Sequence, residues 1–137
     1  MMRKLSLTEI KKVIKHLINE NTEIKFVDHV EVNQPAPFCY VEVASTVPKN
    51  TKTMFVTVYN LHLRLVSKSA NSSIQHDNNI QQIEEAFTNR LILPDTLDAF
   101  NQTDTSIVAD YIDPKTNERN AVIGLSLTVA YGFKAKN

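Results

Sequence analysis

The sequence predicts an α+β fold in one domain over residues 1–137, with elements in the order α-β-β-β-α-β-β. Two segments have the 3.6-residue apolar period of an amphipathic helix, and the others alternate as strands do. The last two strands form a hairpin, so we expect a mostly antiparallel sheet with two helices packed on it. A chain of 137 residues, 42% of them hydrophobic, can bury one core. The ends, 1–4 and 134–137, are expected to be disordered.

The first helix is expected over residues 6–20. Ser6 and Glu9 have the spacing of a capping box, in which each side chain satisfies a free backbone N–H of the first turn. Lysines occupy the other faces of this helix. The apolar stripe consists of Leu7, Ile10, Val13, Ile14, Leu17 and Ile18.

Two short strands are expected next. Ile24–Val32 alternates well enough to be a strand, and the prolines in 35–37 end it because proline cannot donate to a ladder. Phe38–Ala44 reads as the second strand. Ser45–Thr53 is polar and has few side chains to bury, so we expect a loop there.

The third strand is expected over Met54–Val66. One set of alternate side chains is bulky and apolar, while the other set includes Asn60, His62 and Arg64. The first set predicts a core face, and the second predicts a face that is solvated or forms an interface. The apolar set is Phe55, Tyr59, Leu61, Leu63 and Leu65.

A second helix is expected over residues 74–91, after a serine-rich stretch that supplies an N-cap. Its apolar seam, Ile80, Ile83, Phe87 and Leu91, should face the sheet. Pro94 closes it.

The closing hairpin consists of Ser106–Ile112, a turn at 113–117 and the strand Ala121–Phe133. The final strand has a bulky face and a face of small residues. The small face either admits a neighbouring subunit or is packed by this chain's own helix. Its members are Gly124, Ser126, Thr128, Ala130 and Gly132.

Formal charges cancel, with fifteen Lys and Arg against fifteen Asp and Glu, so no bulk field draws the molecule to nucleic acid or an anionic membrane. The charges are nevertheless segregated along the chain. Basic residues gather in the first helix (Lys11, Lys12, Lys15) and the polar loop (Lys49, Lys52), whereas residues 71–110 are acidic and include Glu84 and Glu85.

No pattern of catalytic or metal-binding residues is present. His16, His29, His62 and His76 lie at spacings that bring no two metal ligands together. The single Cys39 reads as a buried apolar side chain in a strand. Both glycines lie in a predicted strand, where they cannot form a phosphate-binding loop. We therefore expect no enzymatic activity, cofactor, metal or membrane span.

The order of elements resembles the tail terminator family of long-tailed phages, also called tail completion or head-tail joining proteins. The segment that carries this resemblance runs from a strand through a polar, serine-rich break into a helix, MFVTVYNLHLRLVSKSANSSIQHDNNIQQIEEAFTNRL, over Met54–Leu91. The long last strand of the hairpin also fits. The resemblance covers roughly residues 5 to 133 and includes no invariant motif.

The resemblance implies a structural virion protein that forms a hexameric ring on the completed tail tube, ends its polymerisation and docks the head connector. Implied partners are a second copy of this chain, the major tail tube protein and the head connector, with DNA passing through the lumen without specific binding. The implied location is the head-tail junction of the virion, with assembly in the host cytoplasm, and a prophage is one possible source. We expect the interface to include Lys11, Lys12, Lys15, Lys49, Lys52, His62, Arg64, Glu84 and Glu85.

Two alternatives stay open at this point. One is another neck component, such as a head-closure protein. The other is a small α+β binding module with a pocket between helix and sheet, and with His62, Arg64 or His29 at its mouth.

Overall fold

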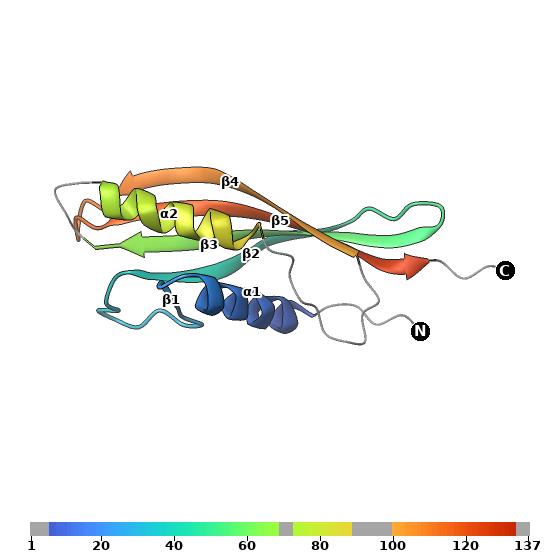
Figure 1. Cartoon of the computed structure of the whole chain (residues 1–137), viewed down its shortest axis with the longest axis horizontal. Helices are drawn as coiled ribbons and strands as arrows, with labels where there is room; N and C mark the ends of the chain where they lie inside the picture. The colour runs from blue at the N-terminus through green and yellow to red at the C-terminus, as the bar shows by residue number, and fades with distance from the viewer. Residues whose placement is uncertain (1–5, 69–72, 89–99, 134–137) are drawn as a thin grey trace.

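A computed structural model describes residues 6–68, 73–88 and 100–133, except for the side chains of 100–102 and 131–133. The expected α+β fold and its element order are confirmed (Figure 1). The ends expected to be disordered lie outside the described residues. The elements are α1 (Leu7–Asn21), β1 (Lys25–Phe26), β2 (Phe38–Pro48), β3 (Met54–Ser67), α2 (Ile74–Ala86), β4 (Phe100–Ile112) and β5 (Arg119–Phe133).

Helix α1 begins at the predicted capping box. The Ser6 hydroxyl accepts from the Glu9 backbone N–H at 3.1 Å, and the Glu9 carboxylate accepts from the Ser6 N–H at 3.1 Å. At its other end, the Thr22 N–H donates to the Ile18 carbonyl at 2.9 Å. The predicted stripe is buried at Ile10, Ile14, Leu17 and Ile18.

The five strands form one sheet in the order β1-β2-β3-β5-β4. Every pairing is antiparallel except that of β1 with β2. The last strand in sequence, β5, therefore lies inside the sheet between β3 and β4. Strands β1 and β2 lie along one side of the sheet, and β4 lies along the other.

Both helices pack on one face of this sheet, which we call the helix face. Leu61, Leu63 and Leu65 of β3 pair with Leu125, Ile123 and Ala121 of β5, and all six are buried in one core with the apolar residues of α1 and α2. The alternate positions point to the opposite face, which we call the open face. The expected division of β3 into a core face and a polar face is confirmed from Tyr59 to Leu65, whereas Phe55 is 36% exposed beyond a register shift.

Two of the boundaries predicted in the first half of the chain are wrong. Only Lys25–Phe26 of the expected strand Ile24–Val32 forms a strand, because only these residues reach a partner, at Phe38 and Cys39. The expected loop Ser45–Thr53 is strand as far as Pro48, which pairs with Thr57. A long hairpin of β2 and β3 results, and Figure 1 shows it extending beyond the helices.

The later boundaries also differ. Helix α2 ends at Ala86, earlier than the expected residue 91, because the Phe87 and Thr88 N–H groups donate in a closing turn. Ile80, Ile83 and Phe87 are buried as expected, while Leu91 and Pro94 lie outside the described residues. Strand β4 begins at Phe100, six residues before the expected start at Ser106, and continues along β5.

Neither α1 nor α2 has the length and apolar character that a membrane-spanning helix needs, over the residues described here.

Candidate functional site

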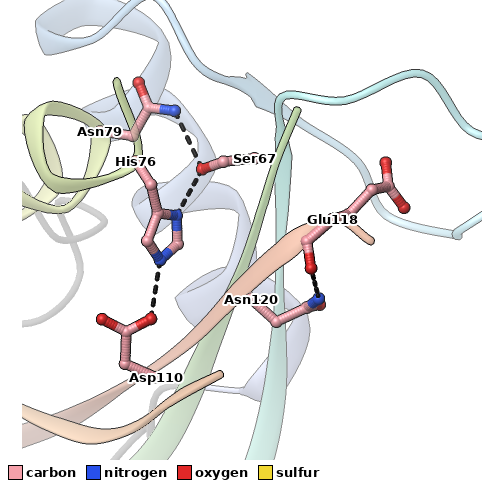
Figure 2. A network of polar contacts seen from close by, with 6 residues as sticks. All are labelled: Ser67, His76, Asn79, Asp110, Glu118 and Asn120. Carbon is pink, nitrogen blue, oxygen red and sulfur yellow. Dashed lines mark hydrogen bonds and ion pairs between the residues drawn. The ribbon is translucent and has the colours of Figure 1, made fainter. Parts of the chain in front are cut away.

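A buried polar cluster joins α2 to two strands of the sheet (Figure 2). The Ser67 Oγ lies 2.6 Å from the Nδ1 of His76, and the Nε2 of His76 lies 3.0 Å from a carboxylate oxygen of Asp110. The Asn79 amide donates to the Ser67 Oγ at 3.1 Å. Ser67, His76 and Asn79 are each at most 3% exposed. This set of four residues is called the His76 cluster below.

The local structure explains why these side chains meet. His76 precedes Ile80 by four residues, so it lies on the core-facing side of α2. Ser67 ends β3 directly below that helix. Asp110 pairs with Ala121 of the helix face, so its side chain projects toward α2. The cluster therefore ties α2 to both β3 and the edge strand β4.

Proton positions in the cluster follow from the inventory of donors and acceptors. The Asp110 carboxylate can only accept, which places a proton on the Nε2 of His76. In the neutral ring Nδ1 then accepts from the Ser67 hydroxyl, and the same oxygen accepts from Asn79. Every nitrogen and oxygen at the centre of the cluster thus has a partner.

A serine, a histidine and an aspartate in contact are also the parts of a hydrolase triad, but this arrangement differs in two ways. In serine hydrolases the serine contacts Nε2 and the carboxylate contacts Nδ1, whereas here the two are exchanged. Ser67 is also only 1% exposed, so a substrate cannot reach its hydroxyl. The geometry supports a structural tie between elements.

On the open face, His62 and Arg64 of β3 lie on the same side, as expected. The Arg64 Nε lies 3.0 Å from the Glu42 carboxylate of β2. Tyr40, beside Arg64 in the register, stacks on Phe38 with ring centroids 6.3 Å apart. Partial burial raises the pKa of the Tyr40 hydroxyl, while the nearby positive charge of Arg64 lowers it. This part of the face is an ordered array of aromatic and charged side chains.

Beside this array, the open face has a depression of about 200 Å³ that includes His62, Asp104 and Ser126 in its lining. Its floor is at Gly124, where an added Cβ would come within 3.0 Å of both Ser106 and Val108 of β4. A larger residue here would therefore press on these two β4 side chains, which would have to shift slightly. The depression lies on the face away from the helices, and it is not the helix-sheet pocket of the binding-module alternative.

The same register shows what the small-residue face of β5 contacts. Gly124, Ser126 and Thr128 pair with His62, Asn60 and Val58, all on the open face. Helices α1 and α2 pack on the other side of the strand, through Leu125 and Leu127. The small residues are therefore not packed by the chain's own described helices.

The predicted interface residues occupy separate places. Lys11 and Lys12 are exposed on α1. Lys15 makes an ion pair with Asp28 at 3.2 Å, so part of its charge is used within the chain. Lys49 and Lys52 are exposed in the turn of the β2–β3 hairpin.

On α2, Glu85 is exposed and accepts from Gln81, whereas Glu84 is half-buried. Gln82 accepts from the backbone of Glu23 just after α1. Glu84 is two residues further on, about 200° around the helix, so it lies on the flank away from α1. The structure does not bring the predicted lysines and glutamates together within one chain.

Instead, charge is divided across the width of the sheet. Helix α1 lies beside β1, and Figure 1 shows α2 lying across the strands nearer β4. Lys11, Lys12 and Lys25 are exposed on the β1–β2 side. Asp104 and Asp110 are exposed on β4, at the other side. Glu23, Asp28 and Glu42 are also exposed on the β1–β2 side, so its charges are mixed, whereas β4 carries only the acidic charges of Asp104 and Asp110.

Cys39 is buried with no exposed surface, as expected, and burial raises the pKa of its thiol to about 12. Among the described residues, no three His, Cys, Asp or Glu side chains gather as metal ligands would. This part of the chain therefore shows no reactive thiol and no metal centre.

The His76 cluster is the feature that sequence reasoning missed. In the sequence, His76 is one of four histidines at spacings that bring no two metal ligands together. The spacing of His76 with Ile80 and Ile83 was the signal that this histidine faces the core. Nothing in the sequence paired it with Asp110, because that contact depends on how β4 docks.

A search of curated proteins finds no match to this chain. A family model described as "Putative tail termination protein" matches residues 1–137. The match covers the whole sequence, including both helices and all five strands, and it agrees with the family suggested by the order of elements. The chain belongs to the phage tail terminator family, and it is thus a structural component of the virion.

Proposed function

We propose that copies of this chain form a ring on the end of the completed tail tube, most simply a hexamer. The ring stops further addition of tube subunits and presents a docking surface to the head connector. The observation that carries this proposal is the family match over residues 1–137. The ring belongs at the head-tail junction of the virion and is built in the host cytoplasm.

The division of charge supports a ring of identical subunits. A contact between unlike surfaces of two copies is heterologous, and it closes into a ring when the rotation between copies allows. The exposed lysines of α1 and β1 on one side and the carboxylates Asp104 and Asp110 of β4 on the other are complementary groups of this kind. Lys11, Lys12 and Glu84 would then face one another across subunits.

The β2–β3 hairpin supports a contact with a second protein. It extends beyond the helices and exposes Lys49 and Lys52 at its turn (Figure 1). Backbone and side-chain contacts hold this turn, because the Asn50 side chain accepts from the Val56 N–H at 2.8 Å. We propose that the hairpin turn contacts the tail tube or lines the lumen through which DNA passes.

The test uses phage in which this gene carries a nonsense mutation, with wild-type or variant chain supplied in trans. Without the chain, we expect tails of irregular length that fail to join heads, because nothing ends polymerisation. Wild-type chain should restore tails of uniform length that carry a ring at one end in negative-stain images. Normal tail lengths with unjoined heads would instead indicate a head-closure protein.

A further inference from the structure

Both outer long strands of the sheet have an unpaired edge within the described residues. Strand β4 pairs with β5 on one side and with no described strand on the other. The pairing of β1 with β2 ends at Cys39, whose carbonyl accepts from Val27, so Val41–Pro48 pairs only with β3. Free backbone donors and acceptors along such edges are templates for another strand.

Strand β4 has some of the features that protect a free edge, the carboxylates Asp104 and Asp110 and a bulge, yet it leaves large apolar side chains exposed. Its sequence, FNQTDTSIVADYI, contains no lysine and no proline. Large apolar side chains are exposed along it, and a register shift between Ile107 and Ala109 turns them to both faces of the sheet. They are Ile107 at 53%, Val108 at 56%, Tyr111 at 47% and Ile112 at 47%. An edge of this composition gains stability by being covered.

Strand directions allow the two edges to pair between copies. The four long strands alternate in direction across the sheet, so β4 runs opposite to β2. A second copy rotated about an axis parallel to the strands therefore presents its β2 antiparallel to β4. Antiparallel pairing is the geometry that the rest of this sheet already uses.

The free edges of β2 and β4 also match in length and in position along the strands. The paired residues Leu63 and Ile123 place Val41 at the same height along the strands as Ile107. In the same way, Thr57 and Val129 place Pro48 at the height of Asn101. At the same height in the next copy, the free stretch Val41–Pro48 would face Asn101–Ile107. The bulge in β2 between Val43 and Ser45 accounts for its one extra residue.

Charge selects β2 over a second β4 as the partner. The free stretch of β2 carries a single charged side chain, Glu42, and its carboxylate already pairs with Arg64. Pairing β4 with another β4 would instead bring together two edges that each carry Asp104 and Asp110. Like charges at such a contact are unfavourable.

From these observations we infer that β4 of one copy pairs antiparallel with Val41–Pro48 of β2 in the next copy. The sheets of adjacent subunits then join into one continuous sheet around the ring. This inference rests on the proposed ring and specifies how its subunits are connected.

Cross-linking of single cysteines tests the pairing. Ser106 of β4 and Ser45 of β2 are exposed, lie on the open face and differ by two register positions in height, and S106C and S45C are nearly isosteric probes. Cys39 is fully buried and does not compete for the reagent. With a short bis-maleimide, a mixture of the two variants should give a dimer, and either variant alone should give none. The double variant should give a ladder that ends at the ring size.

The reaction is carried out on soluble oligomer, or on rings attached to tails if the free chain is monomeric. A dimer from S106C alone would overturn the inference in favour of β4 pairing with β4. Rings without any cross-link between the two positions would overturn the inference and leave the proposed ring standing. Absence of rings both in solution and on tails would overturn both proposals.

A charge placed on the edge gives an independent measurement. Val108→Lys changes a side chain that is 56% exposed in the single chain, so the fold should tolerate it, while a covered edge should not. We expect self-association to weaken about tenfold or more. Val32→Lys, at a side chain that is 92% exposed and outside the sheet, is the matched control and should leave association unchanged. Equal association of V108K and wild type would contradict the inference.

Discussion

The His76 imidazole has a hydrogen-bond partner on each nitrogen, and those partners come from two different strands. Burying a polar ring is costly unless its donors and acceptors are satisfied. Here Ser67 and Asp110 satisfy both nitrogens, and the Asn79 amide donates a hydrogen bond to the Ser67 hydroxyl oxygen. The cluster fixes the position of α2 relative to β4, with Ser67, His76 and Asn79 buried and only Asp110 reaching solvent.

Removing the centre of this cluster should destabilise the chain more than removing its exposed member. For His76→Ala we expect a loss of about 2 to 4 kcal/mol in the free energy of unfolding, from a cavity and from buried groups left without partners. For Asp110→Ala, whose side chain is 46% exposed, we expect about 1 kcal/mol or less. Urea unfolding curves of the two variants provide the comparison, and equal losses would contradict this account of the cluster.

Cys39 yields a prediction about pH. Burial raises the pKa of its thiol from 9.0 to about 12, so between these values the unfolded chain binds fewer protons than the folded chain. Stability contributed by the neutral thiol is complete below pH 9 and is lost as pH rises toward 12. Between pH 8 and pH 10 the wild type should lose about 1.4 kcal/mol more than Cys39→Ala. Parallel pH profiles of the two proteins would contradict the prediction.

Helix α1 begins at the cap that local chemistry predicts. The S-x-x-E spacing and the apolar period are properties of neighbouring residues, and the structure shows the reciprocal bonds between Ser6 and Glu9. Helix α2 differs, because its N-cap residue Ser73 makes no side-chain cap hydrogen bond. We therefore expect the two helix starts to respond differently to the same change.

Ser6→Ala should lower the free energy of unfolding by about 1 kcal/mol, because it removes the acceptor for the Glu9 N–H. Ser73→Ala should change it by much less. Ser6→Asp retains an acceptor at the cap and should stay close to wild type. Thermal unfolding of the three variants measures these differences. A larger loss of stability from Ser73→Ala than from Ser6→Ala would contradict the prediction.

Strand boundaries were harder to predict because they depend on partners distant in sequence. The polar segment Ser45–Pro48 has little to bury, yet β3 supplies a complete antiparallel partner for it. Alternation in Ile24–Val32 suggested a longer strand, but the sheet offers that segment only two paired positions. The His76 cluster was missed for the same reason, since Asp110 reaches His76 only after β4 has joined the sheet.

At the scale of the whole molecule, exposed lysines of α1 lie on the side of the sheet opposite the carboxylates of β4. Lys15 is already engaged with Asp28, so Lys11 and Lys12 are the better probes of a contact between copies. The charges are exposed, so their effect should depend on ionic strength. This dependence separates an electrostatic contact from the apolar edge contact of β4.

Lys11→Glu combined with Lys12→Glu should weaken self-association at low salt, and added salt should reduce the difference from wild type. Adding Glu84→Lys and Glu85→Lys to the same chain restores opposite signs on the two sides, and it should recover association. Light scattering coupled to size exclusion measures each species. Lys115→Glu, in the β4–β5 turn, is the control. No change in the double variant would argue against a contact through α1.

The place of β5 in the sheet has a consequence for biosynthesis. It is translated after every other described element, yet it separates β3 from β4 in the finished sheet. Until β5 has left the ribosome, β4 has no strand partner among the described residues, and its apolar edge is not part of a sheet. The surface that would connect subunits therefore comes into existence only when folding is nearly finished, which delays contact between nascent chains.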